Sequence, residues 1–464
     1  MYNDRAADNV PRANIRRIVM SDSSTGKKQI INPSLPSGFN EYLPSDQILF
    51  NKMIETIRKS YESFGFVPID TPVIERSDVL LAKSGGDTEK QVYRFTKGDS
   101  DLAMRFDLTV PLARYVSMHY GELTFPFRRY HIGRVYRGER PQKGRYREFY
   151  QCDIDIVGNG TLSILNDAEI VGVIYNTFKA LDLGGFTIMI NNRKLLGGFF
   201  ESFGVECITE VLRAVDRLDK AGAAAVSKEL SELGISSECI DATLKLAGLC
   251  GKPSEVLSEV RTWNIANDNF KAGIDELETV CGAVGAYGVP EDAIKVNLRI
   301  ARGLDYYTGT VYETFLNEHP ELGSICSGGR YDELASNYTN QKLPGVGIAI
   351  GLSRLFGQLK ESGLLKDEGR ASMSGILVVP MDDSIEYAIK VAAAMRSRGI
   401  PTETYLNGGK MAKKMGYADK LGIPYVFVCG ETERETSTVT VKNMKTGEQQ
   451  TLPMDLEKGI ELGF

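Results

Sequence analysis

The hydrophobic pattern changes its period several times along the chain, and each change predicts a different kind of element. Residues 45–61 carry apolar side chains at helical spacing and predict a helix, with Ser45 as its N-cap and Gly65 at its end. Residues 66–75 contain two prolines, which predicts an extended segment at the edge of a sheet or at an interface. Residues 93–106 predict a short hairpin. The first hundred residues therefore combine one long helix with short strands.

Two longer strands are predicted on either side of a polar loop. Apolar and aromatic β-formers lie before Arg137 and again from Phe149 to Ile156, and the turn-forming residues 141–144 separate the two runs. This pattern predicts two antiparallel strands joined by a long loop. The arms carry too many apolar residues for a free ribbon, so the hairpin is expected to lie inside a larger sheet.

The second half of the chain changes character twice. Residues 194–291 carry apolar residues at helical spacing, which predicts several helices, and contain no set of residues typical of a catalytic site. In residues 294–300 apolar and polar residues alternate, which predicts a strand that leads into Arg302. A small-residue strand then enters a helix at residues 345–355. After a polar linker, strands and helices alternate as in an α/β domain of about ninety residues. Its predicted elements are the strands 376–380, 402–406 and 425–429, the helices 384–398 and 410–421, and the hairpin 439–442 with 449–452.

Charge is concentrated in the long loop and the strand before it. Residues 128–147 hold seven arginines and one lysine against the single acid Glu139, although the formal net charge of the chain is -6. A planar guanidinium matches phosphate or carboxylate in bidentate geometry, so the pattern predicts a polyanionic ligand held in one orientation. A solvated basic hairpin with no ligand is the alternative.

Composition limits the classes of function. The chain has 464 residues, 42% of them hydrophobic and 25% charged, which describes an ordinary globular protein of two or three domains. Seven cysteines without a CxxC pair favour reduced thiols in a cytosol-like compartment, and three histidines are too few for a His-rich metal site. No apolar run has membrane-spanning length. Residues 1–32 lack periodicity and predict a flexible extension, which could contact RNA or form part of a targeting peptide.

Several segments together resemble one family. The run GERPQKGRYREFYQCDIDIVG, residues 138–158, resembles motif 2 of class II aminoacyl-tRNA synthetases, and its wording is similar to that of histidyl-tRNA synthetases. Residues 302–313, RGLDYYTGTVYE, and residues 327–332, SGGRYD, resemble the two histidyl signatures. Residues 45–75 resemble motif 1, and residues 345–355 resemble motif 3. The resemblance extends from about residue 35 to the C-terminus.

The resemblance implies the fold class and the domains. It predicts an α+β fold, in which an antiparallel class II sheet carries a helical insertion and is followed by a C-terminal α/β anticodon-binding domain. The expected parts are the flexible extension 1–32, the core 33–193, the insertion 194–291, the second part of the core 292–365, and the anticodon-binding domain 375–464. A purely structural role for the helical insertion is the alternative. Four lysines of the last domain, Lys410, Lys413, Lys414 and Lys420, are expected to form a basic stripe, which is otherwise a solvated helix face.

The resemblance also implies a reaction, the activation of histidine by ATP followed by its transfer to the 3′ end of tRNA(His). Arg137 is expected to hold the α-phosphate and Arg302 to stabilise the pentavalent phosphorus from the opposite side. Glu139 is expected near the adenine, Arg145 at the phosphates, and Arg354 at the terminal phosphates or stacked on the adenine. ATP is the substrate and brings Mg²⁺, with no metal held by the protein itself.

A second set of residues is expected to bind histidine. Asp155 accepts from one imidazole nitrogen, Tyr307 serves the other, and Tyr306 and Tyr331 lie nearby. The α-amino group is assigned to Asp107, Thr109 and Gln151. From the residues alone, Asp107 and Thr109 are capping and turn residues, with Thr109 the N-cap of a helix at 110–120. Many relatives have Glu where Asp107 stands. Alternation puts Gln151, Asp153 and Asp155 on one face of their strand.

The predicted partners are tRNA(His), histidine, ATP and a second copy of the chain, in the cytoplasm and with no membrane. Arg140, Gln142 and Lys143 at the loop tip are expected to contact the acceptor end of tRNA. Three rivals remain: the non-catalytic regulatory subunit of ATP phosphoribosyltransferase, a tRNA-sensing module of a stress kinase, and a non-catalytic RNA-binding dimer. The regulatory paralogue lacks the terminal α/β domain and the intact Arg302 signature, so the ligase is favoured over it.

Overall fold

The structure is a computed structural model that describes residues 31–82, 87–141, 144–300, 306–365, 370–381 and 383–460. The chain divides into two units between Pro36 and Ser37. In the first unit, residues 31–36 have no regular structure, and the rest of the predicted extension lies outside the described residues. All further elements belong to the second unit.

The largest sheet has nine strands among the described residues. In spatial order they are β1 (Val67–Pro68), β5 (Phe127–Tyr136), β6 (Glu148–Val157), β12 (Gly345–Ile350), β11 (Cys326–Tyr331), β10 (Thr310–Leu316), β7 (Phe186–Asn192), β9 (Ile294–Asn297) and β8 (Cys250–Gly251). The strands from β5 to β7 pair antiparallel along this order, which confirms the α+β class and places the predicted hairpin inside a larger sheet. β1 pairs parallel to β5 at the edge, as the two prolines predict.

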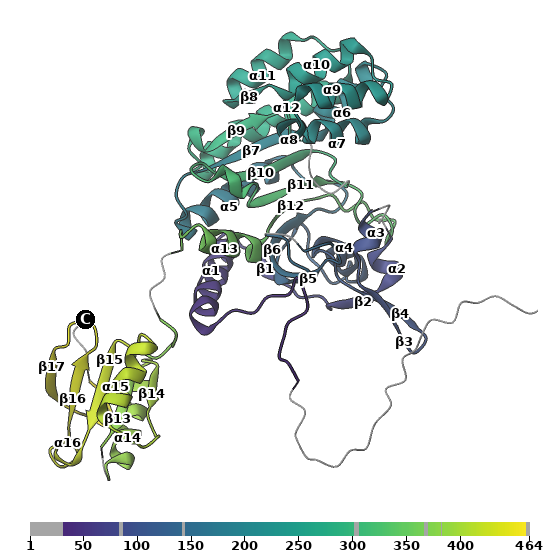
Figure 1. Ribbon diagram of the computed structural model, residues 1–464. Coiled ribbons are helices and arrows are strands. Elements are labelled where there is room, and N and C mark those ends of the chain that lie inside the picture. Colours follow the sequence, from purple (N-terminus) through teal and green to yellow (C-terminus); the bar gives the residue numbers. More distant parts are fainter. Residues whose placement is uncertain are drawn as a thin grey trace, which may run out of the picture. The chain divides into compact units, whose positions relative to one another are not determined.

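Three helices cover one face of this sheet: α1 (Pro44–Ser63), α5 (Leu165–Leu181) and α13 (Leu352–Glu361) (Figure 1). Alternate residues of β6, such as Ile154, join buried side chains of these helices, such as Tyr61 and Phe356, in one core. The Tyr61 hydroxyl donates to the carbonyl of Cys152 over 3.0 Å and fixes α1 against the sheet. Pro44 rather than Ser45 begins α1, and its N-cap is Leu43, so the predicted cap is wrong by two residues.

Three alternate residues on the other side of β6, Gln151, Asp153 and Asp155, are polar and also buried. Their partners across the pairing with β5 are Gly133, His131 and Arg129. Because alternate residues of paired strands face the same side of a sheet, these groups form one polar row on the face away from the three helices. The predicted alternation is thereby confirmed, and this row forms the floor of the site.

A small sheet of β2 (Ile74–Arg76), β4 (Ser100–Met104) and β3 (Arg94–Lys97) precedes α4 (Thr109–Met118). Two short helices, α2 (Ser77–Leu80) and α3 (Asp87–Gln91), accompany it. β3 and β4 are the predicted hairpin. Thr109 is the first residue of α4 and not its N-cap. The cap is supplied by Asp107, whose Oδ1 accepts from the Val110 backbone N–H over 3.0 Å.

Helices fill the segment after β7, as the apolar spacing predicts. They are α6 (Arg193–Ser202), α7 (Ile208–Asp216), α8 (Leu218–Ala221), α9 (Ala223–Glu232), α10 (Ser237–Ala247), α11 (Pro253–Thr262) and α12 (Asp268–Ala283), followed by the 3-10 turns η1 (Val284–Tyr287) and η2 (Glu291–Ala293). The strand predicted for 294–300 ends at Asn297, because the Asn297 side chain and carbonyl accept from Arg299 and Ile300 backbone N–H groups and start a turn. A further 3-10 turn, η3 (Pro320–Leu322), follows β10.

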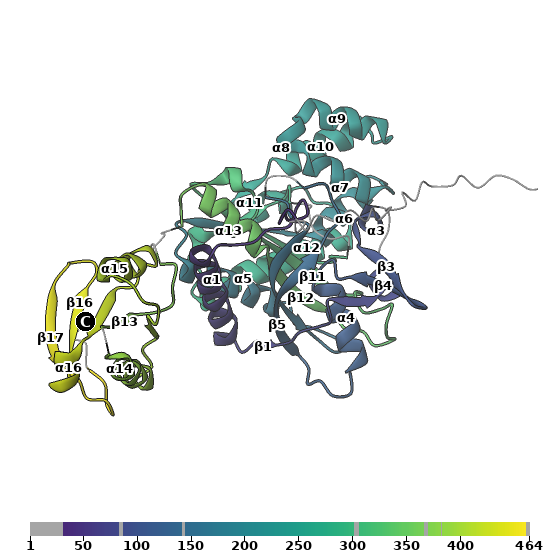
Figure 2. The same cartoon turned by 60° about the horizontal axis from the view of Figure 1, so that its bottom comes forward.

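The last part of the chain contains a five-stranded sheet in the order β14 (Thr402–Thr404), β13 (Ile376–Pro380), β15 (Tyr425–Cys429), β16 (Thr438–Asn443) and β17 (Gln449–Pro453). Figure 1 labels all five strands, and Figure 2 shows β13, β16 and β17 with α14 (Ile385–Ser397), α15 (Met411–Lys420) and the short α16 (Glu431–Glu435). Ile376 and Val378 pack with α14, whereas Leu377 and Val379 pack with α15, so the two helices cover opposite faces. Every predicted element is present. The basic stripe is not complete, because Lys414 is buried and its Nζ donates to the Pro380 carbonyl over 2.7 Å.

All seven cysteines are free thiols. Across the ranges that the structure describes, no helix is long and apolar enough to cross a membrane.

Candidate active site

A cavity of 420 Å³ opens where the loop after β5 meets β6, β11 and α13. Five residues predicted to bind ATP or histidine line it together: Arg137, Glu139, Arg145, Gln151 and Arg354. The other lining residues are Gln91, Gly144, Tyr146, Phe149, Ser324, Ile325, Cys326, Ser327, Ala349, Gly351, Leu355 and Gln358. Three guanidinium groups and one carboxylate around one cavity make it suited to a phosphate-bearing ligand.

Arg137 is held between two aromatic rings. Its Cζ lies 4.3 Å from the centre of the Phe106 ring and 5.1 Å from that of Phe149, and its Nε donates to the Phe106 carbonyl over 3.2 Å. Burial lowers the pKa of the guanidinium, and Asp107 and Glu139 oppose that shift. Its cationic plane is therefore fixed in orientation before any ligand arrives.

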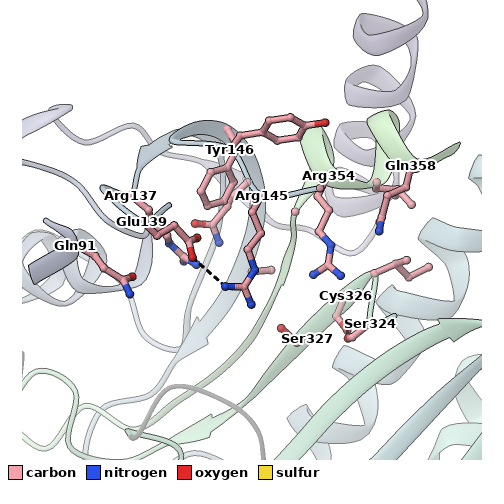
Figure 3. A pocket seen from close by; sticks show the side chains of 17 residues that line it. Gln91, Arg137, Glu139, Arg145, Tyr146, Ser324, Cys326, Ser327, Arg354 and Gln358 are labelled. Atoms are coloured by element: carbon pink, nitrogen blue, oxygen red, sulfur yellow. Dashed lines mark hydrogen bonds and ion pairs between the residues drawn. The ribbon is translucent and has the colours of Figure 1, made fainter. Parts of the chain in front are cut away.

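Arg145 and Arg354 reach the cavity from different elements, the loop and α13, and point into the same space (Figure 3). Arg145 Nη1 lies 3.0 Å from Glu139 Oε2, although 60% of the Arg145 side chain is exposed. Arg354 Nη2 donates to the Leu322 carbonyl over 3.2 Å. An exposed arginine held only by an ion pair can turn toward a ligand at small cost.

The base of the loop is fastened by Arg147. Its backbone N–H donates to the Gly38 carbonyl over 2.8 Å, its carbonyl accepts from the Arg137 N–H over 2.9 Å, and its Nε donates to the Glu139 carbonyl. These bonds hold Arg137 and Glu139 at the mouth of the cavity.

A second group of predicted residues lies on the polar row of β5 and β6. Asp155 Oδ2 is 2.5 Å from Arg129 Nη2, and Asp155 Oδ1 accepts from the Tyr331 hydroxyl over 2.9 Å. Burial raises the pKa of the Asp155 carboxyl to about 6, and Arg129 and then Tyr331 oppose the rise. Asp155 is thus a buried acceptor with a fixed orientation.

Three tyrosines surround this carboxyl. The rings of Tyr306 and Tyr307 have centroids 4.8 Å apart, and those of Tyr306 and Tyr331 have centroids 6.0 Å apart. Burial raises the pKa of all three hydroxyls, so they remain hydrogen-bond donors at neutral pH. A Cβ on Gly329 would lie 2.9 Å from the Tyr307 ring, which shows how closely the sheet and the rings approach.

Asp107 and Thr109 are buried at the start of α4, with 5% and 9% of their surface exposed. Burial raises the pKa of Asp107, whereas its backbone bond to Val110 and the nearby Arg137 lower it. The Asp107 carboxyl therefore caps the helix through Val110 and also interacts with the Thr109 backbone N–H.

Five atoms of the polar row lack a hydrogen-bond partner within the described part of the chain: Gln151 Oε1, Asp153 Oδ1, His131 Nδ1, Arg129 Nε and Arg129 Nη1. Burial raises the pKa of Asp153 well above its ordinary value, Arg129 opposes the shift, and Asp155 and Asp107 add to it. Unsatisfied buried polar atoms beside a cavity are typical of a site completed by its ligand or by water.

Comparison with known proteins decides the family. Residues 38–355 match the family described as Histidyl-tRNA synthetase, and residues 375–457 match the family described as Anticodon binding domain. A histidine–tRNA ligase of Clostridium tetani is 57% identical over 94% of this chain and 99% of its own length, and one of Finegoldia magna is 46% identical over 92% and 98%. The crystal structure of histidyl-tRNA synthetase from Nostoc sp. PCC 7120 matches with a TM-score of 0.85 at 40% identity and covers 92% of this chain and 99% of its own.

The chain belongs to the histidyl-tRNA synthetase family. It is an aminoacyl-tRNA ligase with the class II fold and the activity of a histidine–tRNA ligase. A structure named ATP phosphoribosyltransferase regulatory subunit/histidyl-tRNA synthetase, from Bacillus halodurans C, matches with a TM-score of 0.72 at 22% identity and shares the fold. The regulatory paralogue is not favoured, because the near full-length relatives at higher identity are ligases.

Three predicted residues of this histidyl-tRNA synthetase chain, Arg302, Gln142 and Lys143, lie outside the described residues. Arg140 is described and exposed. Gln151 lines the cavity, while Asp155 and the tyrosines lie in the second group. Arg137 connects the two, because its charge interacts with both Glu139 and Asp107.

The sequence interpretation missed several residues that line or shape the site, among them Gln91, Phe106, Phe149 and Arg129. Pairing the two arms of the hairpin outward from its loop would have found Arg129 opposite Asp155. No comparable signal marks Gln91, which lies far from the other residues in sequence. Among the described residues, no group of three or more His, Cys, Asp or Glu side chains is arranged to hold a metal ion.

Proposed function

We propose that Arg137 and Arg302 carry the activation step, in which the carboxylate of histidine attacks the α-phosphorus of ATP and pyrophosphate leaves. The nucleophile is already ionised, so the step requires positioning and stabilisation of negative charge rather than a side-chain base. The observation that supports this assignment is the rigid Arg137 guanidinium, stacked on Phe106 beside a cavity with two further arginines. Arg302 is assigned by its place in the RGLDYY segment.

The cavity is assigned to ATP. Glu139 is placed near the adenine, Arg145 at the phosphates, and Arg354 at the terminal phosphates or against the adenine. Their convergence on one cavity supports the assignment. Binding of the phosphates at Arg145 would replace its partly exposed ion pair with Glu139, and this exchange would free the Glu139 carboxylate for the adenine amino group.

Histidine is assigned to the second group. Asp155 accepts from one imidazole nitrogen, the Tyr307 hydroxyl serves the other, and Tyr306 and Tyr331 fix their orientation. The α-amino group is assigned to Asp107, Thr109 and Gln151. Hydrogen bonds to both imidazole nitrogens select against other amino acids of similar size. A ligand without these nitrogens would leave buried polar groups of the site unpaired, which costs more binding free energy than the loss of an apolar contact.

Magnesium is assigned to ATP rather than to a protein site. Mg²⁺ prefers oxygen ligands and usually keeps several waters, bound through one or two carboxylates and substrate phosphates. Among the described residues that line the cavity, Glu139 is the one carboxylate, and it is assigned to the adenine, so the ion is placed on the phosphates of the nucleotide. When bound, the ion neutralises phosphate charge. Arg137 and Arg354 hold the phosphates in place around it.

Transfer to tRNA(His) is assigned to the same site, with Arg140, Gln142 and Lys143 at the acceptor end. The helical part, residues 194–291, is placed near the acceptor arm, and residues 375–464 bind the anticodon. We also propose a homodimer that forms at the motif 1 segment. Exposed apolar side chains there, Val67 at 48% and Ile74 at 47%, support this surface. Seven free thiols and the family fit a cytoplasmic location.

The test is histidine-dependent exchange of labelled pyrophosphate into ATP without tRNA, with wild type beside Arg302→Ala. We expect exchange with histidine and with no other amino acid, and a loss on the order of 100-fold in the variant. Folded wild-type protein without exchange would overturn the assignment of the site. Exchange that survives in the variant would overturn the role of Arg302 alone.

A further inference from the structure

We infer that Arg129 is a positioning residue for the choice of histidine: it keeps Asp155 as an ionised, fixed acceptor for the imidazole. This inference rests on the proposed role of Asp155. Arg129 was not among the residues that the sequence singled out, and it does not line the nucleotide cavity. Its effect is therefore expected on histidine and not on ATP.

Arg129 and Asp155 form a buried ion pair with a fixed orientation. Arg129 and Asp155 are cross-strand partners in the β5–β6 pairing, and Arg129 Nη2 lies 2.5 Å from Asp155 Oδ2. None of the Arg129 side chain is exposed and only 4% of the Asp155 side chain is. Tyr331 occupies the other oxygen from β11, so the carboxyl is held from two strands.

Arg129 makes fewer hydrogen bonds than Arg330, a second buried arginine whose role is structural. Arg330 uses its whole fork: Nε and Nη2 contact Asp167, and Nη1 and Nη2 also donate to the Leu162 and Ser163 carbonyls. Arg129 donates through Nη2, to Asp155 and to the Leu108 carbonyl at 3.4 Å. Its Nε and Nη1 have no partner within the described residues. Unmet donors on a buried cation cost stability, so stability alone does not explain its burial.

The positive charge of Arg129 matters because burial disfavours the ionised form of the Asp155 carboxyl. Burial raises the pKa of Asp155, and Arg129 is the largest opposing influence. Within the described residues, the other titratable groups that interact with Asp155 are Asp107, Asp153, Tyr306, Tyr307 and Tyr331. None of these is a cation. Without Arg129 the carboxyl would hold its proton at neutral pH, and a protonated carboxyl has one O–H donor and is a weaker, uncharged acceptor for the imidazole N–H.

The experiment measures the KM for histidine in pyrophosphate exchange from pH 5.5 to 8.5 for wild type and Arg129→Met. Histidine itself titrates near pH 6.5, so the ratio of the two KM values at each pH is compared, in which that titration cancels. We expect a ratio of at least about 10 near pH 7, since each unit of pKa is a factor of ten. The ratio should shrink toward pH 5.5, where both enzymes carry a protonated Asp155, while the KM for ATP stays the same.

The matched control is Arg128→Met. Arg128 is the next residue on β5, faces the other side, and has its own carboxylate, with Nη2 2.6 Å from Glu169 Oε1. Its KM ratio for histidine is expected to be near one at every pH. A ratio for Arg129→Met that is constant with pH, or near one throughout, would overturn the inference.

A double-mutant cycle with Asp155→Asn keeps the inference testable if Arg129→Met does not fold. The double variant leaves no uncompensated buried charge, so it is expected to fold. If Arg129 acts through Asp155, the double variant has a histidine KM within about 3-fold of Asp155→Asn alone. If the two substitutions instead raise the histidine KM independently, so that their fold-changes multiply in the double variant, the inference is overturned. Wild type without histidine-dependent exchange would instead refute the proposed function, before any variant is compared.

Discussion

Gly347 leaves the space that the Asp155 carboxyl occupies. The two residues are partners in the β6–β12 pairing, and a Cβ on Gly347 would lie 2.6 Å from Asp155 Cγ and would overlap Oδ1 and the Ile154 carbonyl. The neighbouring Gly345 has the same relation to the Tyr331 ring. The small residues of this strand therefore shape the proposed histidine site, because they let β12 pass beneath its buried groups.

Gly347→Ala is expected to raise the KM for histidine at least about 10-fold, because overpacking of this kind displaces its neighbours at a cost of roughly 1–3 kcal/mol. Pyrophosphate exchange at several histidine concentrations measures it. Gly197→Ala is the control, since no atom outside its own helix backbone and chain neighbours lies within 4 Å of the added Cβ. A folded Gly347→Ala enzyme with the wild-type KM would show that Asp155 does not need its observed position.

Arg137→Ala is expected to slow pyrophosphate exchange on the order of 100-fold, the cost of losing a principal charge-stabilising donor. Arg137→Lys should not restore the rate, because an ammonium lacks the planar fork that stacks on Phe106. Arg134→Ala is the control, with a side chain 51% exposed and directed at Glu148. Each assay uses saturating histidine and ATP, so that a change in the exchange rate is not caused by weaker substrate binding. An Arg137→Ala rate within 3-fold of wild type would contradict the role.

Arg330→Met is expected to destabilise the fold by about 3–5 kcal/mol, because it leaves Asp167 buried without its counter-charge. Arg330 Nη2 is 2.5 Å from Asp167 Oδ2, and 7% and 0% of the two side chains are exposed. The double variant Arg330→Met with Asp167→Leu should recover most of this loss. Arg58→Ala, which breaks only exposed pairs with Glu55 and Glu62, should cost less than about 1 kcal/mol. Denaturant unfolding of the four proteins gives the comparison, and equal losses for Arg330 and Arg58 would refute it.

His131 predicts how stability depends on pH. Burial, and then Arg129 and Arg105, lower its pKa to about 3. In the unfolded chain His131 is protonated near pH 6.5, whereas in the folded chain it stays neutral until about pH 3. The free energy of unfolding therefore falls as the pH falls from about 6.5 to about 3. Relative to His131→Gln, wild type should lose about 2 kcal/mol between pH 7.5 and 5. Unfolding free energies that run parallel for the two proteins over this range would disprove it.

Local signals in the sequence identified the elements well, and the long-range pairings were beyond them. The hairpin of β5 and β6 follows from alternating residues around a turn-rich loop, and its place in a larger sheet follows from its apolar arms. The partner of Asp155 follows only when the register is counted outward from the loop, because a shift of one residue in register would turn Arg129 to the other face. Capping was misassigned for a similar reason. Thr109 and Asp107 both fit the start of α4, and only the folded backbone shows that Asp107 accepts the Val110 N–H.

The lysines of α15 predict a separation between the two steps of the reaction. Lys410 and Lys413 are exposed, whereas Lys414 is buried against the Pro380 carbonyl, in the segment that matches an anticodon binding domain. Lys410→Ala with Lys413→Ala should raise the KM for tRNA in aminoacylation and reduce its salt dependence, since binding releases about one counterion for each phosphate that a lysine neutralises. Pyrophosphate exchange without tRNA should be unchanged, because histidine and ATP are assigned to the other sheet.

Lys445→Ala, an exposed lysine in the turn between β16 and β17, controls for a general loss of positive charge. Its tRNA KM and salt dependence are expected to stay close to those of wild type, because only lysines that face the tRNA backbone neutralise its phosphates. A tRNA KM that rises equally in both proteins would assign the effect to net charge. A fall in pyrophosphate exchange would show that Lys410 and Lys413 act on the first step as well.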